Sequence, residues 1–311
     1  MSGDLGAEVF VRAAASTLQK YRNLELILVG DGDELRGLVD RIIGSDSRLR
    51  IEHASEVVGM SEAPAEALRK KKDSSMRVAI NLVKEGAADA CVSAGNTGAL
   101  MATAKFVLKM LPGIDRPAII AELPAMGGTV HMLDLGANTQ ATAEHLFQYA
   151  VMGSIVAADI RGIVEPRIAL LNIGAEDTKG HDTVKEAAAV LSASTLNYVG
   201  FVEGTDLMSG KTDVVVTDGF SGNVALKTIE GTVAFGKHIL SRAFKRNWIT
   251  KLQAFLASSV LRHLSAEMDS RNYNGATLAG LNGNVIQSHG SADAYAFQLA
   301  IDTALVVVRN Q

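Results

Sequence analysis

The chain contains 311 residues, of which 48% are hydrophobic and 21% charged, a balance typical of a globular protein with one large or two ordinary domains. Its net charge of −4 argues against a nucleic-acid binder, and a single cysteine, Cys91, excludes an intramolecular disulfide and a multi-thiolate metal site. No apolar run approaches the ~18 residues of a membrane span, and the first residues lack the apolar core of a signal peptide. We therefore expect a cytoplasmic protein.

Short β-branched runs alternate with longer helical patterns, and glycine-rich turns lie between them. Strands are expected at residues 24–29, 48–53, 90–93, 118–123, 130–135, 167–173, 213–217 and 284–286. Helices are expected at residues 34–43, 76–84 and 224–230, and after the turns at 94–98 and 136–138, to about Met110 and Met152. This order predicts parallel βαβ units in one α/β domain over residues 1–311, a doubly wound, Rossmann-like α/β/α sandwich with a mostly parallel sheet.

In such sheets ligands bind at the carboxyl ends of the strands, so we expect the polar turns there to converge on one cleft. One of these turns joins the strand at 90–93 to a helix. Its small residues would let the backbone approach an oxyanion that faces the free N–H groups of the helix. The candidate phosphate ligands in this turn are Ser93, Gly95, Asn96, Thr97 and Gly98. An ordinary turn in which Asn96 or Thr97 caps the helix is an equal alternative.

Three further turns carry polar candidates for substrate binding. Lys179 lies between glycines, where a lysine can neutralise a phosphate, although a solvated surface lysine is commoner. The other candidates in these turns are Asn138, Gly174, Glu176, Asp218, Ser221 and Asn223. For the turn at 218–223, a purely structural role through side-chain hydrogen bonds is the alternative.

His289 follows the apolar run at residues 284–286 and could serve as a general acid–base group. A histidine that caps the following helix is equally compatible with the sequence. The chain contains no HExxH or GxSxG motif and no clustered ligand spacing, so we expect neither a metal site nor a serine-hydrolase elbow.

Residues 231–266 contain six basic residues and no acidic one, with apolar residues at steps of three and four. This pattern predicts one or two amphipathic helices that project from the domain. Such helices usually pack on their own domain. The cationic face and the only tryptophan favour a partner or a membrane surface as a competing interpretation, with Lys245, Arg246 and Trp248 as the contact residues.

Taken together, these motifs resemble those of the bacterial phosphate acyltransferases of fatty-acid and phospholipid synthesis, the PlsX family. The matching stretches occur in order over essentially the whole chain and include LILVGD, VSAGNTGALM, LDLGAN, LLNIGAEDTKG, DVVVTDGFSGNVALKTIEG and NGATLAGLNGNVIQSHGSA. The resemblance implies a homodimer that transfers a fatty acyl group from acyl carrier protein to inorganic phosphate. The acyl phosphate product would feed a membrane glycerol-3-phosphate acyltransferase and thus phosphatidic acid synthesis.

On this interpretation phosphate is itself the nucleophile, and no cofactor or metal is required. We assign as a hypothesis Lys179 to phosphate or to transition-state charge, Asn223 to the thioester oxygen and His289 to the departing thiolate. A phosphotransacetylase-like enzyme that uses an acyl-coenzyme A donor is one alternative. A non-enzymatic scaffold at a membrane surface, built on residues 231–266, is another. Peripheral contact with the inner face of the cell membrane is compatible with the enzyme as well, whereas nucleic acid is not an expected partner.

The chain departs from the family pattern in two places. Members of the family usually begin with a strand that leads into an Asp-Ala-Met-Gly-Gly-Asp turn, whereas here Met1 occupies the position of the methionine of that turn. We therefore expect that Met1 is not the native start and that a strand at or near the centre of the sheet precedes it. The second departure is at residues 274–280, where NGATLAG replaces a turn with the sequence Gly-Gly-Ala-Pro-Leu-Leu-Gly.

Overall fold

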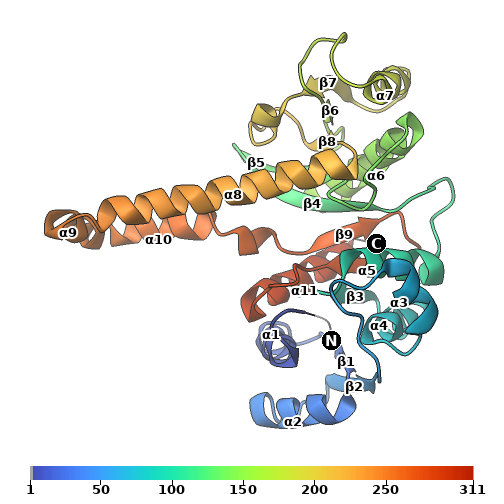
Figure 1. Cartoon of the computed structure of the whole chain (residues 1–311), viewed down its shortest axis with the longest axis vertical. Helices are drawn as coiled ribbons and strands as arrows, with labels where there is room; N and C mark the ends of the chain where they lie inside the picture. Colours follow the sequence, from blue (N-terminus) through green and yellow to red (C-terminus); the bar gives the residue numbers. More distant parts are fainter. Residues whose placement is uncertain (1–2, 311) are drawn as a thin grey trace.

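Two β-sheets form the framework of the protein in the computed structural model, which describes residues 3–310 (Figure 1). The smaller sheet pairs β1 (Leu26–Gly30) with β2 (Leu49–His53) in parallel. The larger sheet has the order β3-β10-β9-β4-β5-β8-β6-β7. Its strands are β3 (Ala90–Ser93), β4 (Ala118–Ala125), β5 (Gly128–Leu133), β6 (Ile168–Leu171), β7 (Tyr198–Val202), β8 (Val214–Val216), β9 (Ala276–Ala279) and β10 (Asn284–Gln287).

The larger sheet is mixed, and its two halves run in opposite directions. β5, β8, β6 and β7 are parallel to one another, as are β3 and β10, but β4 and β9 join these groups through antiparallel pairs. The prediction of separate parallel units at 118–123 and 130–135 is wrong, since β4 and β5 form a hairpin. A link of Met126 and Gly127 is too short for a parallel crossover, which needs a dozen or more residues. The α/β class and the largely parallel sheet are confirmed.

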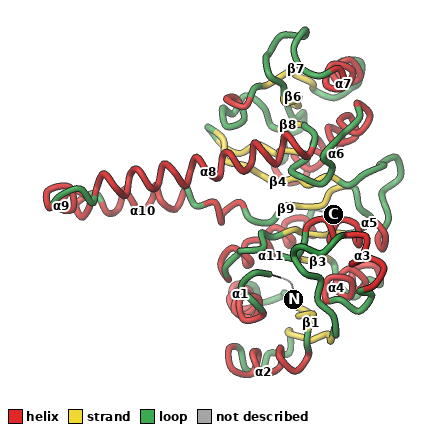
Figure 2. The backbone as a smooth tube through the Cα atoms, in the orientation of Figure 1, coloured by secondary structure: helices red, strands yellow, loops and turns green. Residues whose placement is uncertain are grey.

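Helices cover both faces of this framework (Figure 2). We call the part of the larger sheet formed by β3 and β10 the β3 half, and the part formed by β5, β8, β6 and β7 the β5 half. The helices that precede or flank the β3 half are α1 (Ala7–Lys20), α2 (Gly32–Ile42), α3 (Pro64–Lys70), α4 (Ser75–Lys84), α5 (Thr97–Leu108) and α11 (Ala294–Arg309). The β5 half carries α6 (Ala143–Arg161), α7 (Asp182–Ser192) and α8 (Gly219–Phe244). Short 3-10 turns occur at Gly204–Asp206 and Ser270–Tyr273. Apolar side chains of α4, α5 and α8 form one core layer, and those of α6 and α7 form another on the opposite face.

The helix expected at residues 76–84 is present as α4, and the Ser74 side chain caps it by accepting a hydrogen bond from the Arg77 N–H. Two helices extend beyond the ends that the sequence predicts for them. The helix expected to end near Met152 runs to Arg161, where Gly162 closes it in the left-handed conformation (φ 66°). The helix expected to end at residue 230 continues as α8 through Gly231, because an interior glycine costs a helix only about 1 kcal/mol.

The helical projection predicted for residues 231–266 is present (Figures 1 and 2). It consists of the second half of α8, α9 (Trp248–Leu256) at the tip and α10 (Ser258–Glu267). α10 returns toward the sheets, and Met268 beyond it approaches Gly236 of α8. The projection therefore has three helical segments rather than one or two, because Asn247 and Ala257 interrupt the helical pattern as cap residues.

Cys91 gives a direct check of the packing of β3. Its side chain is buried, and burial raises the pKa of the thiol to about 12. Since the thiolate is the reactive form, we expect no labelling of the folded protein by a disulfide reagent in mildly alkaline buffer, and one equivalent of labelling after denaturation. Release of thionitrobenzoate measures both. Rapid labelling of the folded protein would contradict the packing.

Candidate active site

Three of the predicted turns lie side by side at one edge of the sheet. They follow β5, β8 and β6, which are adjacent and parallel, so their carboxyl ends meet at that edge. These turns span residues 134–138, 217–223 and 172–180. The turns after β3 and β10 follow strands that run in the opposite direction. The expectation that all of these turns converge on one cleft stays a prediction, although they do not follow the strands of one parallel sheet.

Asp134 organises the turn after β5. It is fully buried, and its two oxygens accept backbone hydrogen bonds over 2.7 to 3.2 Å from Ile119, Gly136, Ala137 and Asn138. The Asn138 amide donates to the same carboxylate (2.9 Å) and to the Pro117 carbonyl (2.8 Å). Burial raises the pKa of Asp134, and the hydrogen bonds lower it in part. Asn138 thus holds the turn, and its amide is engaged within the protein.

The first turn of α8 packs backbone to backbone on this Asp134 turn. A Cβ added to Gly222 would lie 1.9 Å from the Asp134 carbonyl oxygen, and one added to Gly219 would lie 2.6 Å from that of Asn138. Only glycine permits this approach. It brings the Asn223 side chain over Gly136, where a Cβ would be 3.7 Å from the Asn223 Cγ. Within residues 3–310 the Asn223 amide has no hydrogen-bond partner.

Asp218 and Ser221 are engaged in capping α8. Asp218 accepts hydrogen bonds from the Ser221 N–H and hydroxyl, both at 2.9 Å. This geometry is the structural alternative anticipated for these two residues. Their proposed contact with substrate stays a prediction.

Lys179 and Glu176 extend from the turn after β6. The Asn172 amide donates to the Lys179 carbonyl (3.2 Å) and so closes the turn. A Cβ on Gly174 would lie 2.7 Å from Glu176 Oε2 and 3.0 Å from Lys179 Cγ, so both side chains lie over this glycine. In the part of the chain that the structure describes, neither the Lys179 ammonium nor the Glu176 carboxylate has a polar partner. Both charged groups are therefore available to a ligand.

Asn96 caps α5 and also holds a neighbouring loop. Its oxygen accepts a hydrogen bond from the Ala99 N–H (3.0 Å), and its amide donates to the carbonyls of Met60 (2.7 Å) and Glu62 (3.0 Å). The Glu62 carboxylate accepts in turn from the Gly59 N–H (3.0 Å).

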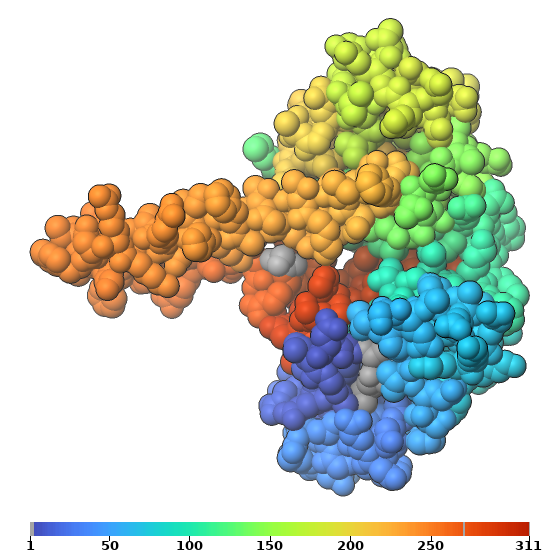
Figure 3. Space-filling view, viewed as in Figure 1, coloured from blue at the N-terminus to red at the C-terminus, as the bar shows by residue number. Residues whose placement is uncertain are grey.

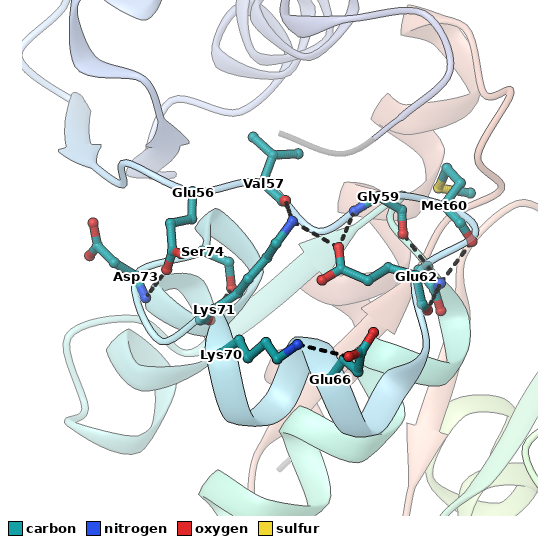
Figure 4. Close-up of polar contacts among 11 residues, drawn as sticks. Glu56, Val57, Gly59, Met60, Glu62, Glu66, Lys70, Lys71, Asp73 and Ser74 are labelled. Atoms are coloured by element: carbon teal, nitrogen blue, oxygen red, sulfur yellow. Dashed lines mark hydrogen bonds and ion pairs between the residues drawn. The ribbon is translucent and has the colours of Figure 1, made fainter.

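Lys71 contacts the loop at residues 57–62 from the other side. Its ammonium pairs with Glu62 at 2.8 Å and donates to the Val57 carbonyl (Figure 4). The loop at 57–62 is thus fixed beside the N-terminus of α5. Thr97 and Gly98, in the first turn of α5, have N–H groups that precede the helical ladder and suit an anion.

Ser93 and Gly95 take internal contacts near the same helix end. The Ser93 hydroxyl accepts from the Gly95 N–H (3.2 Å), and the Gln287 amide donates to the Gly95 carbonyl (3.2 Å). Both residues therefore shape the turn between β3 and α5. Phosphate contact by the residues of this turn stays a prediction.

His289 follows β10 and is held by three neighbours. Its backbone N–H donates to Asn274 Oδ1 (3.0 Å). Its ring contacts Ser291 Oγ (2.8 Å) and the ammonium of Lys227 (3.4 Å). Nε2 faces the Lys227 ammonium, and Nδ1 faces the hydroxyl of Ser291 and accepts from the Ser291 N–H (3.3 Å). Lys227 also pairs with Glu230 at 2.8 Å.

Helix α8 connects the turn after β5 with His289, which follows β10. Asn223 and Lys227 are four residues apart and share one face of this helix, about 5–6 Å from each other, and Lys227 reaches His289. The space-filling view shows a hollow between α8 and the elements of the β3 half (Figure 3). The sequence interpretation missed Lys227, although its i+4 spacing from Asn223 was a usable signal. No contact in the described residues links Lys179 directly to His289.

The residues from 3 to 310 include no group of three or more His, Cys, Asp and Glu side chains that could hold a metal ion. Nor does this part of the chain contain a helix both long and apolar enough to cross a bilayer.

Solved phosphotransacetylases share this fold. One from Streptococcus pyogenes matches with a TM-score of 0.66 and 23% identity, over 98% of this chain and 92% of that chain. A branched-chain phosphotransacylase from Enterococcus faecalis V583 matches with a TM-score of 0.63 and 15% identity, over 99% and 97%. At these identities the likeness defines the class of fold alone.

Sequence comparison defines the family. Residues 1–311 match the family described as fatty acid synthesis protein. A phosphate acyltransferase of Alkalilimnicola ehrlichii is 56% identical over 311 residues, which cover 100% of this chain and 91% of the relative. Another, of Nitrosococcus oceani, is also 56% identical, over 100% and 92%. The chain therefore belongs to the phosphate acyltransferase family and is an acyltransferase.

Proposed function

We propose that this protein transfers a fatty acyl group from acyl carrier protein to inorganic phosphate. The observation that carries the proposal is the set of donors around α8: the unpartnered Asn223 amide, the Lys227 ammonium and His289. Such groups suit an anionic acceptor and a developing oxyanion. The acyl phosphate formed would be consumed by a membrane glycerol-3-phosphate acyltransferase in phosphatidic acid synthesis.

The reaction needs alignment more than a protein nucleophile. An oxygen of hydrogen phosphate attacks the thioester carbonyl carbon, the carbon–sulfur bond breaks, and the proton that the phosphate loses passes to the departing sulfur, which leaves as a thiol. In our assignment Lys179 neutralises the phosphate, Asn223 donates to the carbonyl oxygen as it gains charge, and His289 supports the departing sulfur. Holding the two reactants together lowers the entropic part of the barrier.

Trapping the acyl phosphate with hydroxylamine tests this function. Purified protein, acyl-acyl carrier protein and phosphate should yield acyl hydroxamate, and omission of phosphate should abolish it. Acyl-coenzyme A in place of the acyl carrier protein should support a lower kcat/KM. Equal or better use of acyl-coenzyme A would replace the proposal with a phosphotransacetylase-like activity. Vesicle binding without any phosphate-dependent transfer would point to the scaffold.

Replacing His289 by glutamine should lower turnover about 10²-fold or more, the ordinary contribution of a general acid–base group. The pH profile of the remaining activity should lose one of its limbs. His263→Gln is the matched control, because His263 is an exposed residue of α10 whose ring pairs with Glu267 at 3.5 Å. Full activity of the His289 variant with an unchanged pH profile would remove this role.

The projection is also part of the proposal. Trp248, Phe255 and Leu256 at the tip are about three-quarters exposed (74%, 75% and 74%), an unusual exposure for large apolar side chains. We assign the apolar faces of α8 and α10 to a homodimer and the tip to an anionic membrane surface, where each Lys or Arg adds about 1 kcal/mol.

Reversing charge at Lys245 and Arg246 should weaken binding to anionic vesicles and leave transfer from acyl carrier protein intact. Sedimentation with vesicles of anionic lipid measures the first, and the hydroxamate assay measures the second. Lys84→Glu, an exposed change on α4, is the control. A steep rise in KM for acyl carrier protein at low salt would instead assign these residues to the carrier. If neither measurement changes, the projection at residues 231–266 serves only packing in the dimer or in the core.

A further inference from the structure

His289 belongs to a loop at residues 288–291, the histidine loop, which begins where the sheet ends. In the described residues the antiparallel pairing of β10 with β9 ends at Gln287 and Ala276. Two residues beyond this pair on each segment, the same register places His289 opposite Asn274. There the Asn274 side chain, rather than a backbone carbonyl, accepts the hydrogen bond of the His289 N–H (3.0 Å). One amide side chain thus takes the place of a strand partner.

Both ends of the Asn274 amide are engaged. Its NH₂ group donates to Ser288 Oγ (2.8 Å) and to the Ala296 carbonyl (2.7 Å), while its oxygen accepts from the His289 N–H. A backbone carbonyl only accepts and a backbone N–H only donates, so the two ends of the amide cannot be exchanged. The side chain therefore fits its place in one orientation and connects the histidine loop to α11.

The two residues that accept from this amide are themselves held by the fold. Ser288 is fully buried, and its N–H donates to the Ser93 carbonyl at the end of β3 (2.8 Å). Ala296 lies in the first turn of α11, and its N–H donates to the cap residue Asp293 (2.8 Å). The amide thus links the histidine loop to a strand on one side and to a helix on the other.

The backbone at Asn274 is also held on α11. Its N–H donates to the Arg271 carbonyl (3.1 Å), and the Arg271 guanidinium pairs with Asp293 at the start of α11 (2.8 Å). Gly275 follows with φ 109°, and a Cβ there would lie 2.8 Å from the Ala300 Cα of α11. Loss of the amide side chain would therefore release the histidine loop and leave the segment that carried the amide in place.

The position of the His289 ring follows from that of the loop. The ring lies between Ser291, which contacts Nδ1, and the Lys227 ammonium of α8, which lies 3.4 Å from Nε2. Ser291 belongs to the histidine loop and moves with it, whereas Lys227 belongs to α8. The distance between the ring and α8 therefore depends on where the loop is held.

We propose that Asn274 is a positioning residue for acyl transfer, whose amide holds the histidine loop so that the His289 ring faces α8. The inference rests on the proposed function, in which His289 supports the departing sulfur. Proton transfer requires hydrogen-bond reach, and a displacement of about 1 Å can cost up to about 10² in rate. Because protein groups engage both ends of the Asn274 amide, this residue acts through His289 and not on the substrate.

Replacement of Asn274 by alanine should lower kcat about tenfold in the hydroxamate assay and leave KM for phosphate and for the carrier protein unchanged. In a His289→Gln background the same replacement should change kcat less than about twofold, because a residue that acts through His289 then has nothing to position. Asn272→Ala is the matched control. Asn272 lies in the same segment, but its side chain bonds to Ala266 and Tyr295 instead, so its kcat should equal that of the wild type.

Hydrogen exchange of the His289 amide gives a readout that does not depend on activity. Since the acceptor of this N–H is the Asn274 side chain, Asn274→Ala should speed its exchange about tenfold or more. Asn274→Asp keeps an acceptor for the same N–H but cannot donate to the Ala296 carbonyl. It should lie between the wild type and the alanine variant in both exchange and kcat, and it replaces the alanine variant if that protein fails to fold.

Unchanged exchange at His289 in the alanine variant would overturn the proposal. So would an equal loss of kcat with and without His289, because a purely structural effect would act in both backgrounds. If His289→Gln is slow but Asn274→Ala is fully active, this inference alone fails and the proposed function stands. If His289→Gln is fully active, the role of the histidine in the proposed function fails, and the positioning role fails with it.

Discussion

Replacing Lys179 by alanine is expected to lower phosphate-dependent acyl transfer by about 10²–10³-fold, the usual effect of removing one positioned donor from a transition state. The ammonium has no partner in the described residues, so no ion pair is broken and the fold should be unchanged. The loss should appear both in turnover and in saturation by phosphate. Initial rates of acyl hydroxamate formation at varied phosphate concentration measure the two effects.

Lys185→Ala is the matched control for this change. Lys185 lies on α7 in the same half of the protein and pairs with Asp182 at 3.6 Å, an exposed pair of little energetic weight. The Lys185→Ala variant should retain full activity. Near-normal turnover and unchanged phosphate saturation in the Lys179 variant would assign this lysine to solvent instead.

The positions of most strands could be predicted from the sequence, because β-branched runs bounded by glycine are local signals. The strand predicted at 90–93 coincides with β3. The order of the strands could not be predicted in the same way. β9 and β10 come from the end of the chain yet lie between β3 and β4, and such long-range pairing leaves no local pattern.

The candidate site, too, could be predicted from the sequence only in part. Sequence motifs located the turns, but they could not separate the side chains that bind a ligand from those that build the turn. Asn96, Asn138 and Asp218 are polar residues in glycine-rich turns, and the structure engages the side chains of all three in caps or loop contacts. Asn and Asp are favoured in such turns for their hydrogen bonds alone. Lys179 and Asn223 differ from these residues in having no side-chain partner in the described part of the chain, which only the folded structure reveals.

Asp134 was not among the predicted site residues, yet its removal is expected to have the largest effect on stability. Asp134→Ala would leave four buried or half-buried backbone N–H groups and the Asn138 amide without their acceptor. Each orphaned donor costs about 1–3 kcal/mol, although the costs do not add fully. A loss of about 3–5 kcal/mol is a large part of the total stability of a domain, about 5–15 kcal/mol.

Asp134→Asn separates the two halves of this network. One carboxylate oxygen serves Ile119, Gly136 and Ala137, and the other serves only Asn138. The amide oxygen of asparagine can replace the first, while its NH₂ group would face the donors of Asn138. The free energy of unfolding, measured with urea, should therefore be highest for the wild type, lower for the asparagine variant and lowest for the alanine variant. Since α8 packs on this turn through Gly222, activity should fall in the same order. Equal stability of all three proteins would show that the carboxylate does not hold the turn.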